Sequence, residues 1–213
     1  FFLMIRRPPR STLFPYTTPF RSLELRRSKA EWKSCAWFEN RYELHNGLPF
    51  YEQRGLILKV NRISTVYFSP AGSTKKITTI SAEHMGEAMK IPTTVIDVTC
   101  PKSREKHFSF QSDELTIFGF PTYAGRIPNK ILPFLKENFK GDNSPAIAMV
   151  SFGNRNFDSS LTELQEELLK NGFRVFAAGA FSCRHVFSKK IAPGRPDDSD
   201  ISKISSKDRK SVV

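Results

Sequence analysis

From Ile63 onward, short apolar runs rich in β-branched and aromatic residues alternate with amphipathic stretches. The apolar runs predict five β-strands, at residues 63–68, 93–98, 115–120, 146–151 and 174–181. The amphipathic stretches predict helices at about residues 74–89, from residue 131 through Leu135 and Phe139, and at 158–172. Because apolar strands alternate with helices, we expect an α/β fold with a doubly wound, five-stranded parallel sheet.

The predicted helices carry signals at their ends. For the third helix, Asp158 is the expected N-cap, Ser160 and Glu163 have capping-box spacing, and Gly172 is the expected stop. A fourth helix should begin near residues 196–198, whose acidic side chains suit a helix N-terminus. Only two apolar residues of this helix precede residue 208, so we expect the last helix to be truncated and one sheet face to be poorly covered.

Charge is distributed unevenly along the 213 residues. The formal net charge of +12 would suggest a nucleic-acid partner, but residues 61–200 carry only +3 of it. No apolar run approaches the length of about eighteen residues that a membrane-spanning helix needs. We therefore expect neither a nucleic-acid partner nor a membrane partner.

The two ends of the chain look foreign to the pattern between them. Residues 1–22 resemble the conceptual translation of a sequencing adapter, and residues 208–213 resemble its other end. On this interpretation residues 1–60 are a non-native or disordered tail, with read-through at 23–60, and residues 61–207 form the domain. Residues 23–46 contain no Pro or Gly and could form a helix, but we assign them no role.

Ligands of doubly wound sheets bind beyond the carboxyl ends of the strands, where the strand order reverses. The loop after the first strand contains Ser69, Ala71, Gly72, Ser73 and Thr74. A phosphate bound there would meet backbone N–H groups, hydroxyls and the positive end of a helix. The motifs of ATP-binding and dinucleotide-binding loops are absent, which favours a mononucleotide, and this position matches the FMN site of flavodoxin-like sheets. An ordinary strand-to-helix turn is the alternative.

Two further loops could surround a flavin ring. The second loop contributes Pro121, Thr122, Tyr123, Ala124 and Gly125, and the third contributes Ser151, Phe152, Gly153, Asn154, Arg155 and Phe157. Tyr123 and Phe152 could flank a planar isoalloxazine. A cation such as Arg155 near the N1 edge would stabilise the reduced flavin, although an ordinary solvated arginine is an equal alternative.

Four sequence blocks carry a family resemblance: VYFSPAGSTKK, FGFPTYAGRIPNKILPFL, FGNRNFDSSLTELQEELLKNGF and AAGAFSCRHVFSKKIAPGRPD. In this order they resemble the flavodoxin domain of a bacterial and archaeal family of fused flavodoxin-ferredoxin proteins, over about residues 63–200. The resemblance implies a flavodoxin-like sheet of strand order 2-1-3-4-5, FMN as cofactor, and electron transfer to a redox partner protein or a fused ferredoxin domain. That ferredoxin domain would hold two [4Fe–4S] clusters.

Some residues depart from that family pattern. The three cysteines, Cys35, Cys100 and Cys183, form no C-x-x-C motif, so we expect [4Fe–4S] clusters only in a missing C-terminal domain. Isolated cysteines also fit a reducing cytoplasm. Ala71 stands where flavodoxins usually have a hydroxyl, which should cost about 1 kcal/mol of FMN binding. His185 could border the flavin or lie partly exposed in a loop.

The leading hypothesis is an FMN-binding electron-transfer domain of a flavodoxin/ferredoxin-type redox protein. One alternative is an FMN-dependent NAD(P)H:quinone or nitro reductase, so the question of an enzyme is open. A further alternative is a non-functional truncated fragment.

Overall fold

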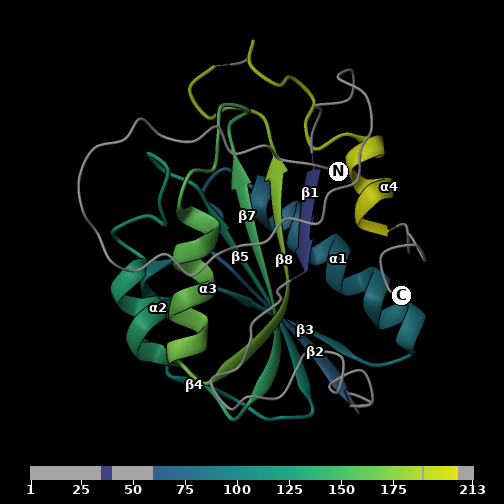
Figure 1. Ribbon diagram of the computed structural model, residues 1–213, viewed down its shortest axis with the longest axis vertical. Helices are drawn as coiled ribbons and strands as arrows, with labels where there is room; N and C mark the ends of the chain where they lie inside the picture. The colour runs from purple at the N-terminus through teal and green to yellow at the C-terminus, as the bar shows by residue number, and fades with distance from the viewer. Residues whose placement is uncertain (1–34, 40–59, 189, 206–213) are drawn as a thin grey trace. The chain divides into compact units, whose positions relative to one another are not determined.

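The computed structural model describes residues 35–39, 60–188 and 190–205, all within one of the two compact units into which the chain divides. The main sheet has the strand order β1-β8-β7-β5-β2-β3 (Figure 1). Its strands are β1 (Cys35–Glu39), β2 (Arg62–Tyr67), β3 (Thr93–Asp97), β5 (Glu114–Pro121), β7 (Ser144–Phe152) and β8 (Phe173–Ser182). A two-stranded sheet is formed by β4 (Phe108–Phe110) and β6 (Phe139–Gly141). The helices are α1 (Ser73–Met89), α2 (Leu132–Asn138), α3 (Ser160–Lys170) and α4 (Asp198–Ser205), with a 3₁₀ helix at Pro101–Glu105.

Five strands of the main sheet are parallel to one another. Numbered along the chain, β2, β3, β5, β7 and β8 lie in the order 2-1-3-4-5, with β2 between β3 and β5. This order confirms the predicted fold class, a flavodoxin-like doubly wound sheet. The five predicted strands are all present, and their ends differ from the predicted ones by at most two residues.

The sequence pattern does not predict the sixth strand, β1. Residues 23–46 could form a helix by their sequence, yet β1 pairs antiparallel with β8, with Cys35 opposite Phe181 and Glu39 opposite Ala177. Pairing with β1 satisfies backbone groups that an edge strand would otherwise leave open, which local propensity does not reveal. The predicted adapter-like and read-through segments otherwise lie outside the described residues, as does the tail at 208–213.

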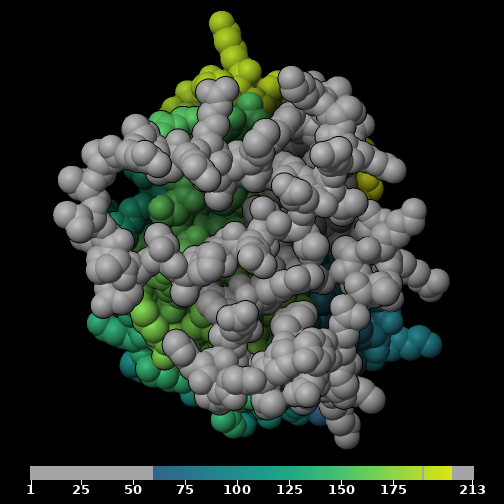
Figure 2. Space-filling model, in the orientation of Figure 1, coloured from purple at the N-terminus to yellow at the C-terminus, as the bar shows by residue number. Residues whose placement is uncertain are grey.

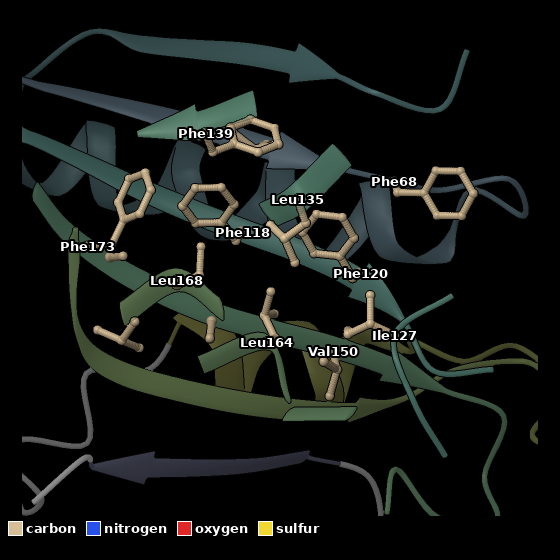
Figure 3. Close-up of a cluster of buried hydrophobic side chains, with 14 of the residues drawn as sticks. Phe68, Phe118, Phe120, Ile127, Leu135, Phe139, Val150, Leu164, Leu168 and Phe173 are labelled. Atoms are coloured by element: carbon tan, nitrogen blue, oxygen red, sulfur yellow. The ribbon is translucent and has the colours of Figure 1, made fainter. Parts of the chain in front are cut away.

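Buried hydrophobic side chains pack against both faces of the sheet. The larger buried cluster lies between the sheet and the helices α2 and α3, and Figure 3 shows part of it. There the rings of Phe139 and Phe173 contact Phe118 edge to face, with centroid distances of 5.6 and 5.0 Å. The smaller cluster lies between the sheet and α1 and includes Ile77 and Met149.

Two predicted helix ends are corrected by the structure. Phe139 does not extend the second helix but begins β6 opposite Phe108, because its ring is buried in the aromatic cluster. Asp158 is not an N-cap, since its φ is 43° and the N-cap position of α3 belongs to Ser159. The carboxylate of Glu163 accepts a hydrogen bond from the backbone N–H of Ile127 at 2.8 Å instead of closing a capping box.

The fourth helix begins where its acidic residues predict. Asp197 Oδ1 accepts a hydrogen bond from the Asp200 backbone N–H at 2.9 Å, and Asp200 Oδ2 accepts one from the Asp197 N–H at 3.1 Å. This reciprocal pair is a capping box built from two aspartates. The helix packs on α1. Over the described residues, no helix has both the length and the apolar character needed to cross a membrane.

Candidate functional site

The candidate site lies at the carboxyl edge of the sheet, where three neighbouring strands end. The sheet reverses its direction of growth at β2, because β3 is added on one side of it and β5 on the other. The loops after β2, β5 and β7 therefore open onto the crevice where such sheets bind ligands. These are the same three loops that the sequence predicts.

The loop between β2 and α1 presents backbone donors. Gly72 has a φ of 82°, a left-handed conformation that glycine adopts without the steric cost of a Cβ atom. Within the described part of the chain, the backbone N–H groups of Ala71, Ser73 and Thr74 have no hydrogen-bond acceptor. Successive N–H groups at the N-terminus of a helix attract an anion. This loop can thus hold a phosphate.

Side chains of this loop hold its shape. Ser69 Oγ accepts a hydrogen bond from the Lys75 backbone N–H at 2.9 Å, and the Ser69 N–H donates to Thr99 Oγ1 at 3.0 Å. The buried hydroxyl of Thr74 lies 2.7 Å from Ser151 Oγ at the end of β7. The hydroxyls of Ser69 and Thr74 therefore have structural partners, and the loop offers mainly backbone N–H groups to a ligand.

The second loop is a tight turn after β5. The N–H of Tyr123 donates to the Arg126 carbonyl at 2.9 Å, and Ala124 and Gly125 between them have φ values of 50° and 80°. Tyr123 is 42% exposed, and partial burial raises the pKa of its hydroxyl above 10.0. The preceding residues, Pro121 and Thr122, join this loop to its neighbours, because the Thr122 N–H donates to the Ser151 carbonyl at 2.7 Å.

The third loop is anchored by aromatic residues. The rings of Phe152 and Phe157 lie 5.6 Å apart and both pack against the larger buried cluster. Asn154 Oδ1 accepts a hydrogen bond from Ser182 Oγ at 3.0 Å, which joins this loop to the end of β8. The Arg155 side chain is 89% exposed and its nearest acidic partner is Asp158, at 3.8 Å. The structure therefore places Arg155 on the surface and both phenylalanines at the base of the loop.

A fourth loop, described at residues 183–188 and 190–197, connects β8 to α4. Of its residues, the sequence pointed only to His185 as one that could border the flavin. The loop lies at the upper edge of Figures 1 and 2. The imidazole of His185 occupies the space beside Gly153, where a Cβ atom would lie 2.6 Å from His185 Cδ2. A hollow of about 310 Å³ separates this loop from the start of α1. It is lined by Ala71, Gly72, Ser73, Lys76, Arg184, Gly194, Arg195 and Pro196.

Sequence patterns did not reveal the basic residues of this hollow. Lys76 is one turn into α1, whereas Arg184 and Arg195 follow β8, more than a hundred residues later. Both arginines lie in the last of the four resemblance blocks, and that block is the signal that could have drawn attention to them. The described residues contain no group of three or more His, Cys, Asp or Glu side chains able to hold a metal ion.

Comparisons with solved structures identify flavodoxins among the similar chains. A flavodoxin from the domain Archaea is 14% identical, with a TM-score of 0.49, and the match covers 68% of this chain and 91% of that one. Oxidised flavodoxin 2 from Bacillus cereus is 17% identical, with a TM-score of 0.48 and coverage of 68% and 92%. An NADH:FMN oxidoreductase in its apo form is 16% identical, with a TM-score of 0.49 and coverage of 68% and 85%. No family model matches the chain, and no curated protein does.

Proposed function

We propose that this domain binds FMN and acts as an electron-transfer module. The observation that carries the proposal is the loop after β2, where the N–H groups of Ala71, Ser73 and Thr74 have no acceptor among the residues that the structure describes, beside the left-handed Gly72. These groups stand at the point where the strand order reverses, which is where flavodoxin-like sheets hold FMN. The oxygens of a phosphate monoester would accept hydrogen bonds from these N–H groups.

Residues of the two neighbouring loops would surround the isoalloxazine ring of FMN. Tyr123 is a partly exposed aromatic residue on the neighbouring loop, and Gly153 and Asn154 supply backbone and amide groups on the next one. We propose Tyr123 as the residue that lies against the isoalloxazine, and the 153–155 segment as the group that tunes its redox state. When bound, FMN supplies the ability to accept and return one or two electrons.

The electron partner belongs to the same proposal. A redox partner protein, or a fused ferredoxin domain carrying [4Fe–4S] clusters, would supply or remove the electrons in the cytoplasm. Among the residues of the site, Arg155 and Tyr123 are exposed, so a partner would meet these two side chains first.

The test is an FMN titration of the full chain, followed by the quenching of flavin fluorescence, with the visible spectrum recorded after desalting. We expect saturable binding and a retained flavin spectrum. The decisive variant is Ser73→Asp, which places a carboxylate among the proposed phosphate donors. Because an acidic residue in the first turn favours a helix, this variant should fold at least as well as the wild type.

We expect Ser73→Asp to weaken FMN binding at least tenfold, since like charges at about 4 Å repel by roughly 1–4 kcal/mol near a protein surface. Ser199→Asp is the matched control, because it adds the same charge to the first turn of α4. Unsaturable binding by the wild-type chain would reject FMN. Equal FMN affinity in Ser73→Asp and Ser199→Asp would place the phosphate elsewhere.

A further inference from the structure

The hollow beside the proposed phosphate loop is lined by three basic residues, Lys76, Arg184 and Arg195, and by no acidic residue among those that the structure describes. These three differ in how far their charges are already compensated. Arg195 is paired, since its guanidinium contacts Asp200 Oδ1 at 2.9 Å and Asp197 Oδ2 at 3.7 Å. Lys76 and Arg184 have no ion-pair partner within the described residues. Two positive charges are thus left facing the hollow.

The fold holds these charges in place. The backbone N–H of Arg184 donates to the Arg195 carbonyl at 3.1 Å, which closes the base of the loop after β8. Lys76 Nζ donates to the Pro196 carbonyl at 3.0 Å, which ties this base to α1. The capping box of α4 fixes the position of Asp200, and Asp200 fixes Arg195. Lys76, Arg184 and Arg195 together form what we call the basic wall. Hydrogen bonds to backbone carbonyls hold it on both sides of the hollow.

We infer that this basic wall completes the phosphate site, with Arg184 as the side chain that contacts the phosphate directly. The inference rests on the proposed function. A phosphate monoester carries a charge of about −1.5 to −2 at neutral pH, which two uncompensated cations would balance. Backbone N–H groups and Lys76 would meet the phosphate from the side of α1, and Arg184 would meet it from the loop after β8. The consequence is selectivity: the domain binds the phosphorylated flavin and discriminates strongly against riboflavin.

Salt dependence follows from the same geometry. Lys76 and Arg184 are exposed, so added salt screens their attraction for a phosphate. Neutral N–H donors alone would give an affinity that changes little with salt. We therefore expect FMN affinity to fall as salt is raised and riboflavin affinity to remain constant.

The experiment measures dissociation constants of FMN and riboflavin for the full chain at low and high salt. The variants are Arg184→Gln, Arg184→Lys and the control Arg174→Gln, which removes the same charge near the opposite end of β8. We expect Arg184→Gln to weaken FMN binding tenfold or more and to change riboflavin binding less than twofold. Arg184→Lys should recover part of the loss, and Arg174→Gln should behave as the wild type. Inorganic phosphate should compete with FMN in the wild type and less so in Arg184→Gln.

The results separate the two levels of the proposal. If neither flavin binds the wild-type chain, the proposed function fails, and this inference fails with it. If FMN binds but Arg184→Gln leaves its affinity unchanged, the function stands and the inference is overturned. Equal weakening of FMN and riboflavin would also overturn it, since it would show that Arg184 contacts the flavin away from its phosphate.

Discussion

At Gly119 the side chains of α1 pack directly against the backbone of β5, and Gly119→Ala should loosen that contact. A Cβ atom at this position would lie 2.1 Å from Thr78 Cγ2 and 3.2 Å from Thr74 Cγ2. Neither distance is tolerated without movement, and Gly119 lies in β5, paired on both sides by β2 and β7. The sheet is held from two sides, so we expect α1 to move.

The cost can be bounded. Overpacking a close contact costs about 1–3 kcal/mol of unfolding free energy. Replacing glycine by alanine returns about 0.4–1 kcal/mol by restricting the unfolded chain. The net loss should be about 1–2 kcal/mol, or a fall of roughly 2–8 °C in Tm for a chain of this size. FMN affinity should fall too, because movement of α1 disturbs the Thr74 to Ser151 hydrogen bond beside the phosphate loop.

The assay is urea unfolding of the wild type, Gly119→Ala, Thr78→Ser and the double variant. Thr78→Ser removes Cγ2 and keeps the hydroxyl that donates to the Thr74 carbonyl at 2.9 Å. Alone it should cost about 0.5–1.5 kcal/mol for the lost methyl group. In the double variant the new methyl fills that space, so its stability should lie above the sum of the single effects by about 1 kcal/mol or more. Additive effects within about 0.5 kcal/mol would refute the argument that these two side chains compete for one space.

Three further predictions test the site and its supports. Ser151→Ala should cost about 1–3 kcal/mol of unfolding free energy in urea, because it leaves the buried Thr74 hydroxyl without its partner; Ser199→Ala, on the exposed surface, should cost almost nothing. Ala71→Ser should tighten FMN binding about fivefold in a fluorescence titration, since one neutral hydrogen bond contributes about 1 kcal/mol; an unchanged affinity would show that this side chain does not face the phosphate. Hydrogen bonding from the Asp200 N–H lowers the pKa of Asp197 in the folded protein below 3.8, its value in the unfolded chain. The ionised Asp197 carboxylate therefore contributes its full stabilisation above pH 3.8, and this contribution is lost as the pH falls through the pKa of the folded state. Amide exchange at the start of α4 should therefore be faster in Asp197→Ala than in the wild type at pH 7, with the two converging in acid; a constant difference would contradict this.

Local pattern was sufficient for most of the fold. The runs at 146–151 and 174–181 are apolar enough to demand burial on both faces, and glycine and acidic residues mark where α3 ends and α4 begins. Such signals depend on residues close together in the chain, so they can be detected before any tertiary contact is known. The three loops of the candidate site followed from the same pattern, because the carboxyl ends of parallel strands meet at one edge of the sheet.

Errors arose where distant contacts override local preference. Phe139 continues a helical stripe by sequence, yet its burial against Phe108 and Phe118 places it in β6. Asp158 has a good capping side chain, but it adopts a left-handed conformation beside Gly125, and Ser159 takes the cap position. The strand β1 pairs with β8, which is far away in the sequence, and no local pattern in residues 35–39 signals that partner.

The division is clearest at the candidate site. The small residues at 69–74 and their place between a strand and a helix predict a loop that offers backbone donors, because donors at a helix N-terminus depend only on local structure. Which side chains lie across from it depends on where the loop after β8 returns. The hydrogen bond from Lys76 to Pro196 joins residues 120 positions apart. The alternation of strands and helices thus determined the fold class and the position of the donor loop, and the family resemblance supplied the strand order. Only the tertiary structure decided that Arg184 shares one hollow with Lys76 and this loop. The reason is physical: the free energy of closing a long loop depends on all the contacts that the closed loop makes, and no short segment of the sequence contains all of those contacts.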